Sequence, residues 1–503
     1  MKIALSEDFT RLVAIKDRKW HVEYHASVIP QRSRYDATDN GTARPDLYNI
    51  MLIMLESQSS ANVVRKMPKT FEYLQGDRNT VMFDGHTIVG EGTTDQLCAI
   101  LVDELEENLP EAKKDAMESG YVDRWPFIFN RFRDNGYVTL FSEDDYRYAA
   151  FNYRLNGFKN PPTDHYARFF WHAAEREDGR PNTQCIGDKL YHQLNFDYTE
   201  SFMDGYRDSP RMGISVASFL AHNNMNNIQH VDDDLVAFMK SMREKGHLEN
   251  TFVFLVGDHG LRASSFRDSF EGWLEERLPF FSFTFPDRFL AKYPDYKNIV
   301  KQNTQTLTSH FDIYATLAHI LSYPTAPTGT TGQSLLTLID RENRTCKSAG
   351  VKDQWCPCQT YVPTDPKEPS ALLMGQSVVK LINRINSQVP EAELACAHLE
   401  LDTVKKIAVK KAVVKEASSG RKNDQFIEML QDNIMPENTI AGMYRITLSV
   451  EPSKAIYEAV VLYSEEDAEL LVNPEISRLN LYGDQPICIM DKHRRLRKYC
   501  FCK

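Results

Sequence analysis

The sequence predicts an α/β protein with a mostly parallel sheet and helices on both of its faces, followed by a small C-terminal α+β domain rich in disulfides. Uninterrupted apolar runs of strand length recur through the first 300 residues. Such runs are typical of strands buried on both faces. Helix-like segments separate them, as in an α/β sheet. Most of the cysteines lie in the last third of the chain.

The predicted elements follow in chain order. Residues 1–45 read as a polar N-terminal lead-in, and residues 46–345 as the main α/β domain. Its buried strands are expected at residues 48–55, 136–141, 213–220, 251–256 and 278–285. A helix is expected around residues 127–133, and a second over residues 232–245, where three aspartates favour the N-terminus and Gly246 ends the helix.

Residues 346–503 form the predicted cysteine-rich C-terminal region, after a stretch rich in Pro, Thr and Gly at residues 323–375. Helices are expected at residues 378–385 and 404–417, with the lysines of residues 405–415 on a solvated helix face. Alternating patterns at residues 443–450 and 456–463 predict strands.

Composition restricts the class of protein and its location. The 503 residues carry a net charge of −11 without a clustered basic surface, which argues against a nucleic-acid partner. No apolar run approaches the roughly 20 residues that span a bilayer, and the first residues do not resemble a signal peptide. The cysteine clusters nevertheless favour disulfides over zinc sites, with the pairing open. We therefore expect a secreted, extracellular or lumenal protein whose targeting segment is not in this chain, and possible glycosylation acceptors at Asn40 and Asn343.

Polar residues directly after the predicted strands are the first candidates for a site, because ligands bind at the carboxyl ends of strands in open α/β sheets. Glu56 follows the first strand, and Asp258-His259 follows the strand at 251–256. Carboxylate and imidazole are good ligands for Zn²⁺ or Mn²⁺. Taken alone, Glu56 reads more readily as a capping or salt-bridged residue.

Three further side chains could take part in chemistry. Thr93 stands before a helix-like segment, where a hydroxyl lies beside free backbone N–H groups and could act as a nucleophile. The alternative is that Thr93, Thr94 or Asp95 is only a helix N-cap. His222 and His310 could bind metal or move a proton, and each reads equally well as a structural histidine.

The order of these residues resembles the alkaline phosphatase superfamily, and the chain is similar to the metazoan sulfatase-like proteins grouped there as a domain of unknown function. The resemblance starts near residue 46 and spans nearly all of the chain from there. It is carried by residues 66–74, 136–139, 143–144, 157–164, 232–235, 257–260, 275–279, 344–346, 476–480 and 499–502.

The resemblance implies a catalytic domain of the sulfatase-like type at residues 46–345 and one divalent metal ion, Zn or Mn. It implies Glu56, Thr93, Asp258 and His259 as metal ligands and Thr93 as a nucleophile that forms a phospho-threonine. His222 would be catalytic. His310 and Asp144 would face the substrate or a second metal ion. The usual His-Asp pair is His222-Asn223 here, which weakens a second metal site.

The function that follows is a metal-dependent phosphotransferase, or a phosphodiester or phosphomonoester hydrolase, acting on a small, glycan-linked or lipid-linked ester. The loops at residues 146–162 and 264–272 are expected to set its specificity. Two alternatives stay open: a catalytically degenerate sulfatase-like binding protein, and a sulfuric ester hydrolase. Cys98 lacks the Cys/Ser-x-Pro-x-Arg setting of formylglycine sulfatases, which disfavours sulfate hydrolysis by that route.

Overall fold

The computed structural model describes residues 7–31, 47–114, 116, 119–178, 184–222, 224–262, 265–359, 361–410, 442–463, 470–480, 482–490 and 492–503. Asn40, Asn223 and the last residues of the helix expected at 404–417 lie outside these ranges.

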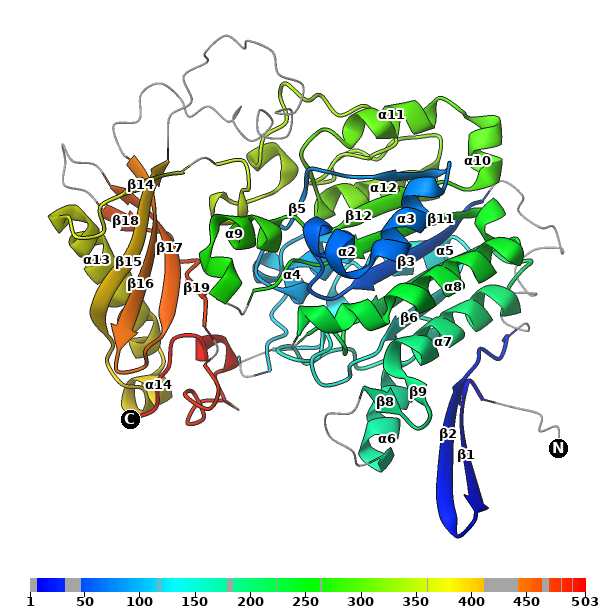
Figure 1. Ribbon diagram of the computed structural model, residues 1–503, viewed down its shortest axis with the longest axis horizontal. Coiled ribbons are helices and arrows are strands. Elements are labelled where there is room, and N and C mark those ends of the chain that lie inside the picture. Colours follow the sequence, from blue (N-terminus) through cyan, green and yellow to red (C-terminus); the bar gives the residue numbers. More distant parts are fainter. Residues whose placement is uncertain are drawn as a thin grey trace.

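A seven-stranded sheet organises the first two thirds of the chain (Figure 1). Its strand order is β4 (Thr80–Met82), β12 (Phe281–Thr284), β11 (Thr251–Gly257), β3 (Asn49–Leu55), β10 (Arg211–Ala217), β6 (Val138–Glu143) and β7 (His165–Tyr166). Strand β12 pairs antiparallel with β11 and with β4, and all the other pairs in this sheet are parallel. The mostly parallel sheet predicted from the sequence is therefore confirmed.

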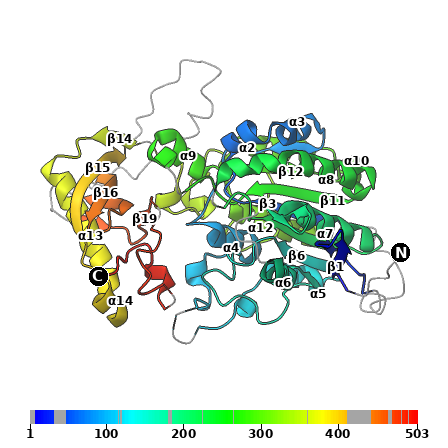
Figure 2. The same ribbon diagram turned by 60° about the horizontal axis from the view of Figure 1, so that its bottom comes forward.

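Helices cover both faces of this sheet (Figure 2). Alternate residues of β3 enter two separate cores, Leu52 one and Ile53 the other. The first core contains residues of α4 (Thr93–Val102), α5 (Ile128–Asp134), α10 (Asp287–Lys292), α11 (Tyr296–Asn303) and α12 (His310–Ser322). The second contains residues of α2 (Ser60–Lys66), α3 (Pro68–Gly76), α6 (Arg168–Asp178), α7 (Tyr191–Gly205) and α8 (Asp232–Glu244). Burial on both faces explains why the strands show no polar alternation.

Short strand pairs lie outside the main sheet. Strand β5 (His86–Thr87) pairs with β13 (Thr308–Ser309), and β8 (Cys185–Ile186) pairs with β9 (Lys189–Leu190). The N-terminal residues form a hairpin of β1 (Phe9–Lys16) and β2 (Lys19–Ala26), which their polar sequence did not lead us to expect. Tyr24 and Ala26 join the second core, and Asp8 contacts His165 at 2.6 Å.

The C-terminal part builds a second sheet around its own core. The strand order is β14 (Tyr361–Thr364), β15 (Glu400–Lys410), β16 (Gly442–Glu451), β17 (Ile456–Tyr463) and β18 (Leu470–Val472), and β19 (Ser477–Arg478) also pairs with β17. Helices α13 (Pro369–Ser387) and α14 (Pro390–Ala395) contribute to this core, and α9 (Phe270–Arg277) lies between the two sheets in Figure 1. The helix predicted at 404–417 is wrong for its described part, because residues 400–410 form β15.

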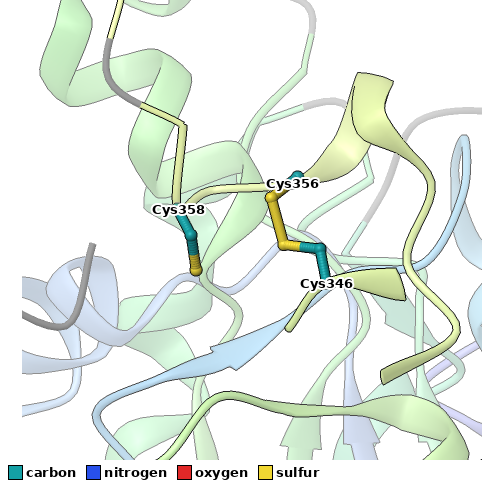
Figure 3. Close-up of side chains that lie close together, drawn as sticks. All are labelled: Cys346, Cys356 and Cys358. Atoms are coloured by element: carbon teal, nitrogen blue, oxygen red, sulfur yellow. A yellow bond between two sulfur atoms is a disulfide. The ribbon is translucent and has the colours of Figure 1, made fainter. Parts of the chain in front are cut away.

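Three disulfides bind the C-terminal part, as the cysteine clusters predicted: Cys346–Cys356, Cys396–Cys500 and Cys488–Cys502. The thiol of Cys358 is buried next to the first of them, with the three sulfur atoms within 4.8 Å of one another (Figure 3). Burial raises the pKa of the Cys358 thiol to about 12.

No helix among the described residues is both long enough and apolar enough to cross a membrane.

Candidate active site

The topology of the sheet brings two carboxylates together. Strands β3 and β11 are adjacent and parallel, with Leu55 opposite Gly257 in the register. The next residue on each strand is Glu56 and Asp258, so both side chains leave the sheet at the same edge. Both are buried, with exposed fractions of 3% for Glu56 and 0% for Asp258. Two buried carboxylates so close together need a cation or a shared proton between them.

Thr93 and His259 complete this cluster. The Thr93 hydroxyl lies 2.8 Å from Asp258 Oδ2 and 3.1 Å from Glu56 Oε2. His259 Nε2 lies 3.3 Å from Asp258 Oδ2 and 3.8 Å from Glu56 Oε1. Ligand atoms around a tetrahedral zinc ion with bonds of about 2.0–2.2 Å lie roughly 3.3–3.6 Å apart. The four side chains are thus spaced as a metal-binding group would be.

The hydrogen-bond donors and acceptors of the cluster also indicate a cation. His259 Nδ1 lies 2.8 Å from the carbonyl oxygen of Gly260, and a carbonyl only accepts, so Nδ1 carries the hydrogen. In the neutral imidazole, Nε2 then turns a lone pair toward two carboxylates. The single hydrogen of Thr93 cannot serve both carboxylate oxygens at once, so the cluster needs either a further proton or a cation. A divalent ion held by Glu56, Thr93, Asp258 and His259 would satisfy all of these lone pairs.

The closeness of the two buried carboxylates also controls the ionisation of Glu56. Burial, followed by the negative charge of Asp258, raises the pKa of Glu56 well above its usual range. Hydrogen bonds from Thr93 and Ser57 oppose this shift. Without a metal ion the pair therefore retains a proton that a cation would displace.

Backbone geometry fixes the two carboxylates. Ser57 adopts a φ of 58°, an uncommon left-handed conformation, and donates its N–H to Asp258 Oδ1 at 2.7 Å and its hydroxyl to Glu56 Oε1 at 3.1 Å. Gly257 permits the close approach of the two chains, because a Cβ at this position would lie 2.0 Å from the carbonyl oxygen of Gln58. The site is therefore built largely by the turns that follow β3 and β11.

Thr93 is the first residue of α4, whose N-cap is Gly92. No side chain caps this helix end, so the N-cap alternative for Thr93, Thr94 or Asp95 does not describe their side chains. The Asp95 carboxylate instead accepts the backbone N–H of Glu91 at 2.8 Å. The Thr93 hydroxyl points to the carboxylates, and the backbone N–H groups of the first turn of α4 are available to an anion.

The other predicted residues lie in different surroundings. His310 is buried beside the cluster, with Nε2 3.3 Å from the carbonyl oxygen of Gly257, and burial lowers its pKa to about 4. The His222 ring stacks on Tyr148 with a centroid separation of 4.6 Å. Asp144 accepts the backbone N–H groups of Ser218 and Phe219, and so orders the turn after β10. Of the three, only His310 is brought next to the four-residue cluster by the contacts described.

Cations near Thr93 were missed by the sequence analysis. Glu91 lies 3.2 Å from Arg262 Nη2 and 3.0 Å from Lys498 Nζ. The position of Arg262, three residues after His259, was the one available signal. Nothing in the sequence connects Lys498 to Glu91, 407 positions earlier.

The comparisons with solved structures give distant likenesses. The C-terminal periplasmic domain of EcEptC from Escherichia coli is 13% identical over 59% of this chain and 88% of its own, with a TM-score of 0.40. The lipoteichoic acid synthase LtaP from Listeria monocytogenes is 12% identical over 66% of this chain and 82% of its own, with a TM-score of 0.39. A protein in the alkaline phosphatase superfamily from Vibrio parahaemolyticus is 9% identical over 94% of this chain and 98% of its own, with a TM-score of 0.39. Likenesses at this level carry no argument about activity.

The sequence comparisons identify the family. No curated protein matches the chain. The model of the family described as "Protein of unknown function (DUF229)" matches residues 1–405, which is most of the chain and includes Glu56, Thr93, Asp258 and His259. The chain therefore belongs to the DUF229 family.

Proposed function

We propose that this chain is a metal-dependent phosphotransferase or phosphoester hydrolase in which the Thr93 hydroxyl is the nucleophile. The supporting observation is the contact of one hydroxyl with two buried carboxylates, beside an imidazole whose Nε2 faces the same point. A structural threonine needs no such surroundings. A nucleophilic hydroxyl needs groups that take its proton and stabilise its oxygen as an anion.

One divalent ion, Zn²⁺ or Mn²⁺, would be held by Glu56, Thr93, Asp258 and His259. When bound, it supplies positive charge that lowers the pKa of the hydroxyl and stabilises a phosphoryl oxygen. The protein contributes the buried position of the carboxylates and the fixed tautomer of His259.

The reaction would proceed in two displacements. Thr93 Oγ1 forms a bond to phosphorus as the bond to the ester oxygen breaks, and the hydroxyl proton passes to the carboxylate of Asp258, 2.8 Å away. Backbone N–H groups at the start of α4 stabilise the phosphoryl oxygens. In this first displacement His222 would protonate the leaving ester oxygen. Water or an acceptor hydroxyl then gives its proton to His222 and attacks the phospho-threonine, while Asp258 returns a proton to the leaving Thr93 oxygen.

The substrate class follows from the compartment. Three disulfides fit an oxidising, non-cytosolic location, and Asn343 is exposed, as a glycosylation acceptor must be. We therefore propose a small, glycan-linked or lipid-linked phospho-ester outside the cytosol. Cys98 is fully buried inside α4, so its position gives no support to a formylglycine sulfatase.

The first test compares Thr93→Ala with Thr93→Ser. We expect Thr93→Ala to reduce hydrolysis of an aryl phosphodiester by about three orders of magnitude or more, because the attacking atom is lost. Thr93→Ser keeps a hydroxyl at the same position and should retain measurable turnover. Steady-state kinetics with the zinc-loaded and manganese-loaded proteins measure both.

Metal content and a second substrate give the controls. We expect about one ion per chain by elemental analysis, and its loss in Asp258→Asn. Full activity in Thr93→Ala would remove Thr93 from the mechanism. A wild-type protein that holds the ion but hydrolyses neither aryl phosphate nor aryl sulfate would support the degenerate binding protein instead, and turnover of the sulfate alone would support the sulfuric ester hydrolase.

A further inference from the structure

Two guanidinium groups lie against the loop that precedes Thr93. Gly92 has a φ of +76°, and a Cβ at this position would lie 2.3 Å from Arg262 Nη1 and 3.7 Å from Arg154 Nη2. Arg262 follows the Asp258-His259 turn, so the same segment brings the cluster and this cation to the start of α4. Positive charge therefore lies beside the candidate nucleophile as well as within the four-residue cluster.

A third cation arrives from the far end of the chain. Lys498 Nζ lies 3.0 Å from Glu91 Oε2, and Arg262 Nη2 lies 3.2 Å from Glu91 Oε1. Lys498 and Arg262 thus share one carboxylate, and this pair of cations has one positive charge that Glu91 does not neutralise. Burial lowers the pKa of Lys498, but the attraction of Glu91 opposes this effect, and the net result is a raised pKa.

Both cations have partly exposed side chains. The exposed fractions of their side chains are 34% for Arg262 and 26% for Lys498. A purely structural network elsewhere in the protein is different: the side chains of Arg267 and Arg277 are exposed by only 1% and 0%. Arg262 and Lys498 therefore lie nearer to the solvent than the arginines of the closed network do.

The C-terminal segment is fixed in place at this position. The carbonyl oxygen of Lys498 accepts the Tyr457 hydroxyl at 2.6 Å, and Cys500 is joined to Cys396. In Figures 1 and 2 this red segment runs from the C-terminal sheet toward the region around α4. The neighbouring Arg497 donates to the Tyr153 hydroxyl at 2.8 Å.

Tyr153 links Arg497 to His222, a predicted catalytic residue, through a chain of ring contacts. Its ring lies edge-on to Tyr148 at 5.1 Å, and Tyr148 stacks on His222. Arg497 therefore contacts the aromatic side chains beside His222, and Lys498 belongs to the cationic group beside Thr93. The family match ends at residue 405, so these contacts come from outside the matched part of the chain.

We propose that Arg262 and Lys498 bind an oxyanion group of the substrate, a phosphate or a sulfate, next to Thr93. The C-terminal disulfide-bonded region thereby completes the substrate site. This inference rests on the proposed function for its catalytic meaning, but the binding of an anion can be measured without turnover. A guanidinium and an ammonium group both form charge-assisted hydrogen bonds with phosphate or sulfate oxygens.

The test is the binding of inorganic phosphate and inorganic sulfate, by calorimetry in low salt with EDTA present to exclude metal-bound anion. Lys498→Met and Arg262→Met should each weaken binding about tenfold, because each removes a charged donor. Lys498→Arg keeps the charge and should restore most of the affinity. The preference of the wild type between the two anions identifies the oxyanion.

Lys352→Met is the matched control. Lys352 pairs with Glu107 and Glu475 and so joins the same two parts of the chain, but at a separate ion pair. Lys352→Met should leave anion affinity unchanged, whereas a mere loss of contact between the two parts would weaken binding in Lys352→Met as well as in Lys498→Met. Thermal unfolding of every variant reports whether the fold is kept.

The outcomes separate this inference from the proposed function. Wild-type protein that binds neither anion, or a folded Lys498→Met variant that binds as tightly as wild type, would overturn the inference. Anion binding that depends on Lys498 in a protein that hydrolyses no ester would support the inference and contradict the proposed function. Hydrolysis that depends on Thr93 but not on Lys498 would support the proposed function and contradict the inference.

Discussion

At the scale of single residues, Glu143 has a measurable pH signature. It ends β6, is buried, and accepts the N–H of Ala150 at 2.9 Å. Burial raises its pKa to about 8, so the folded protein holds a proton that the unfolded chain releases near pH 4.5. Its contribution to stability is therefore complete below about pH 4.5 and decreases as the pH rises toward 8.

Glu143→Gln should remove this dependence, because the amide keeps the acceptor and cannot ionise. The free energy of unfolding of the wild type should fall relative to the variant by up to about 1.4 kcal/mol per pH unit between pH 5 and pH 8. Urea unfolding at several pH values measures this difference. Parallel curves for the two proteins would show that Glu143 is ionised in the folded state.

Residues at the ends of strands were the part of the site that the sequence could predict. Adjacent parallel strands bring their carboxyl ends together, which is why Glu56 and Asp258 meet. The same rule also selected His222, and it cannot tell which strand ends share the ligand, whereas Asp144 came only from the family resemblance. The rule did not select Arg262 or Lys498. Lys498 belongs to the C-terminal part of the chain, and no local sequence pattern encodes its contact with Glu91.

At the scale of elements, β15 shows why a strand resembled a helix. Its pairing with β16 has register shifts between Leu401 and Thr403 and between Val404 and Lys406. The second irregularity places the buried residues Val404 and Ile407 three positions apart, a spacing that also suits one face of a helix. The lysines at the exposed positions of this segment are compatible with either a strand or a helix. The buried strands of the main sheet had no such ambiguity.

The turn after β11 gives a prediction at the same scale. Gly257→Ala would place a Cβ 2.0 Å from the carbonyl oxygen of Gln58, which belongs to backbone and cannot swing aside. We expect a loss of roughly 1–3 kcal/mol in stability, as in overpacked sites, together with weaker metal binding. Urea unfolding and metal titration measure the two effects. Gly136→Ala has open space at its Cβ but a φ of +84°, so its effect isolates backbone strain.

At the scale of the whole molecule, a buried ion-pair network connects the region of α9 to β17 of the C-terminal sheet. Arg267 Nε and Arg277 Nη1 lie 2.6 Å and 2.7 Å from Glu276 Oε2, and both arginines contact Glu458 on β17 at 3.3 Å. The arginines lower the pKa of Glu458 to about 2. Its contribution to stability is present above about pH 4.5 and is lost as the pH falls toward 2.

Glu458→Gln should leave two buried guanidinium groups short of one negative charge. Breaking such a network from one side costs about 3–5 kcal/mol. We expect a clearly lower midpoint of thermal unfolding at pH 7, with a smaller difference between the two proteins near pH 2. Replacing the partly exposed Glu451, which pairs with Lys454 at the surface, should have little effect. An unchanged midpoint in Glu458→Gln would mean that the two sheets hold together without this network.

The thiol of Cys358 has a consequence for anyone who handles this protein. Inside the closed fold it stays protonated and inert, although a disulfide lies within reach of its sulfur atom. Once heat or denaturant opens the region, the same sulfur meets water and ionises at mildly alkaline pH, and it can then displace Cys346 or Cys356 from their bond. Molecules with non-native disulfides would accumulate, and cooling alone would not restore the native pairing. Acidic buffers or prompt alkylation after unfolding keep the original linkage intact for analysis.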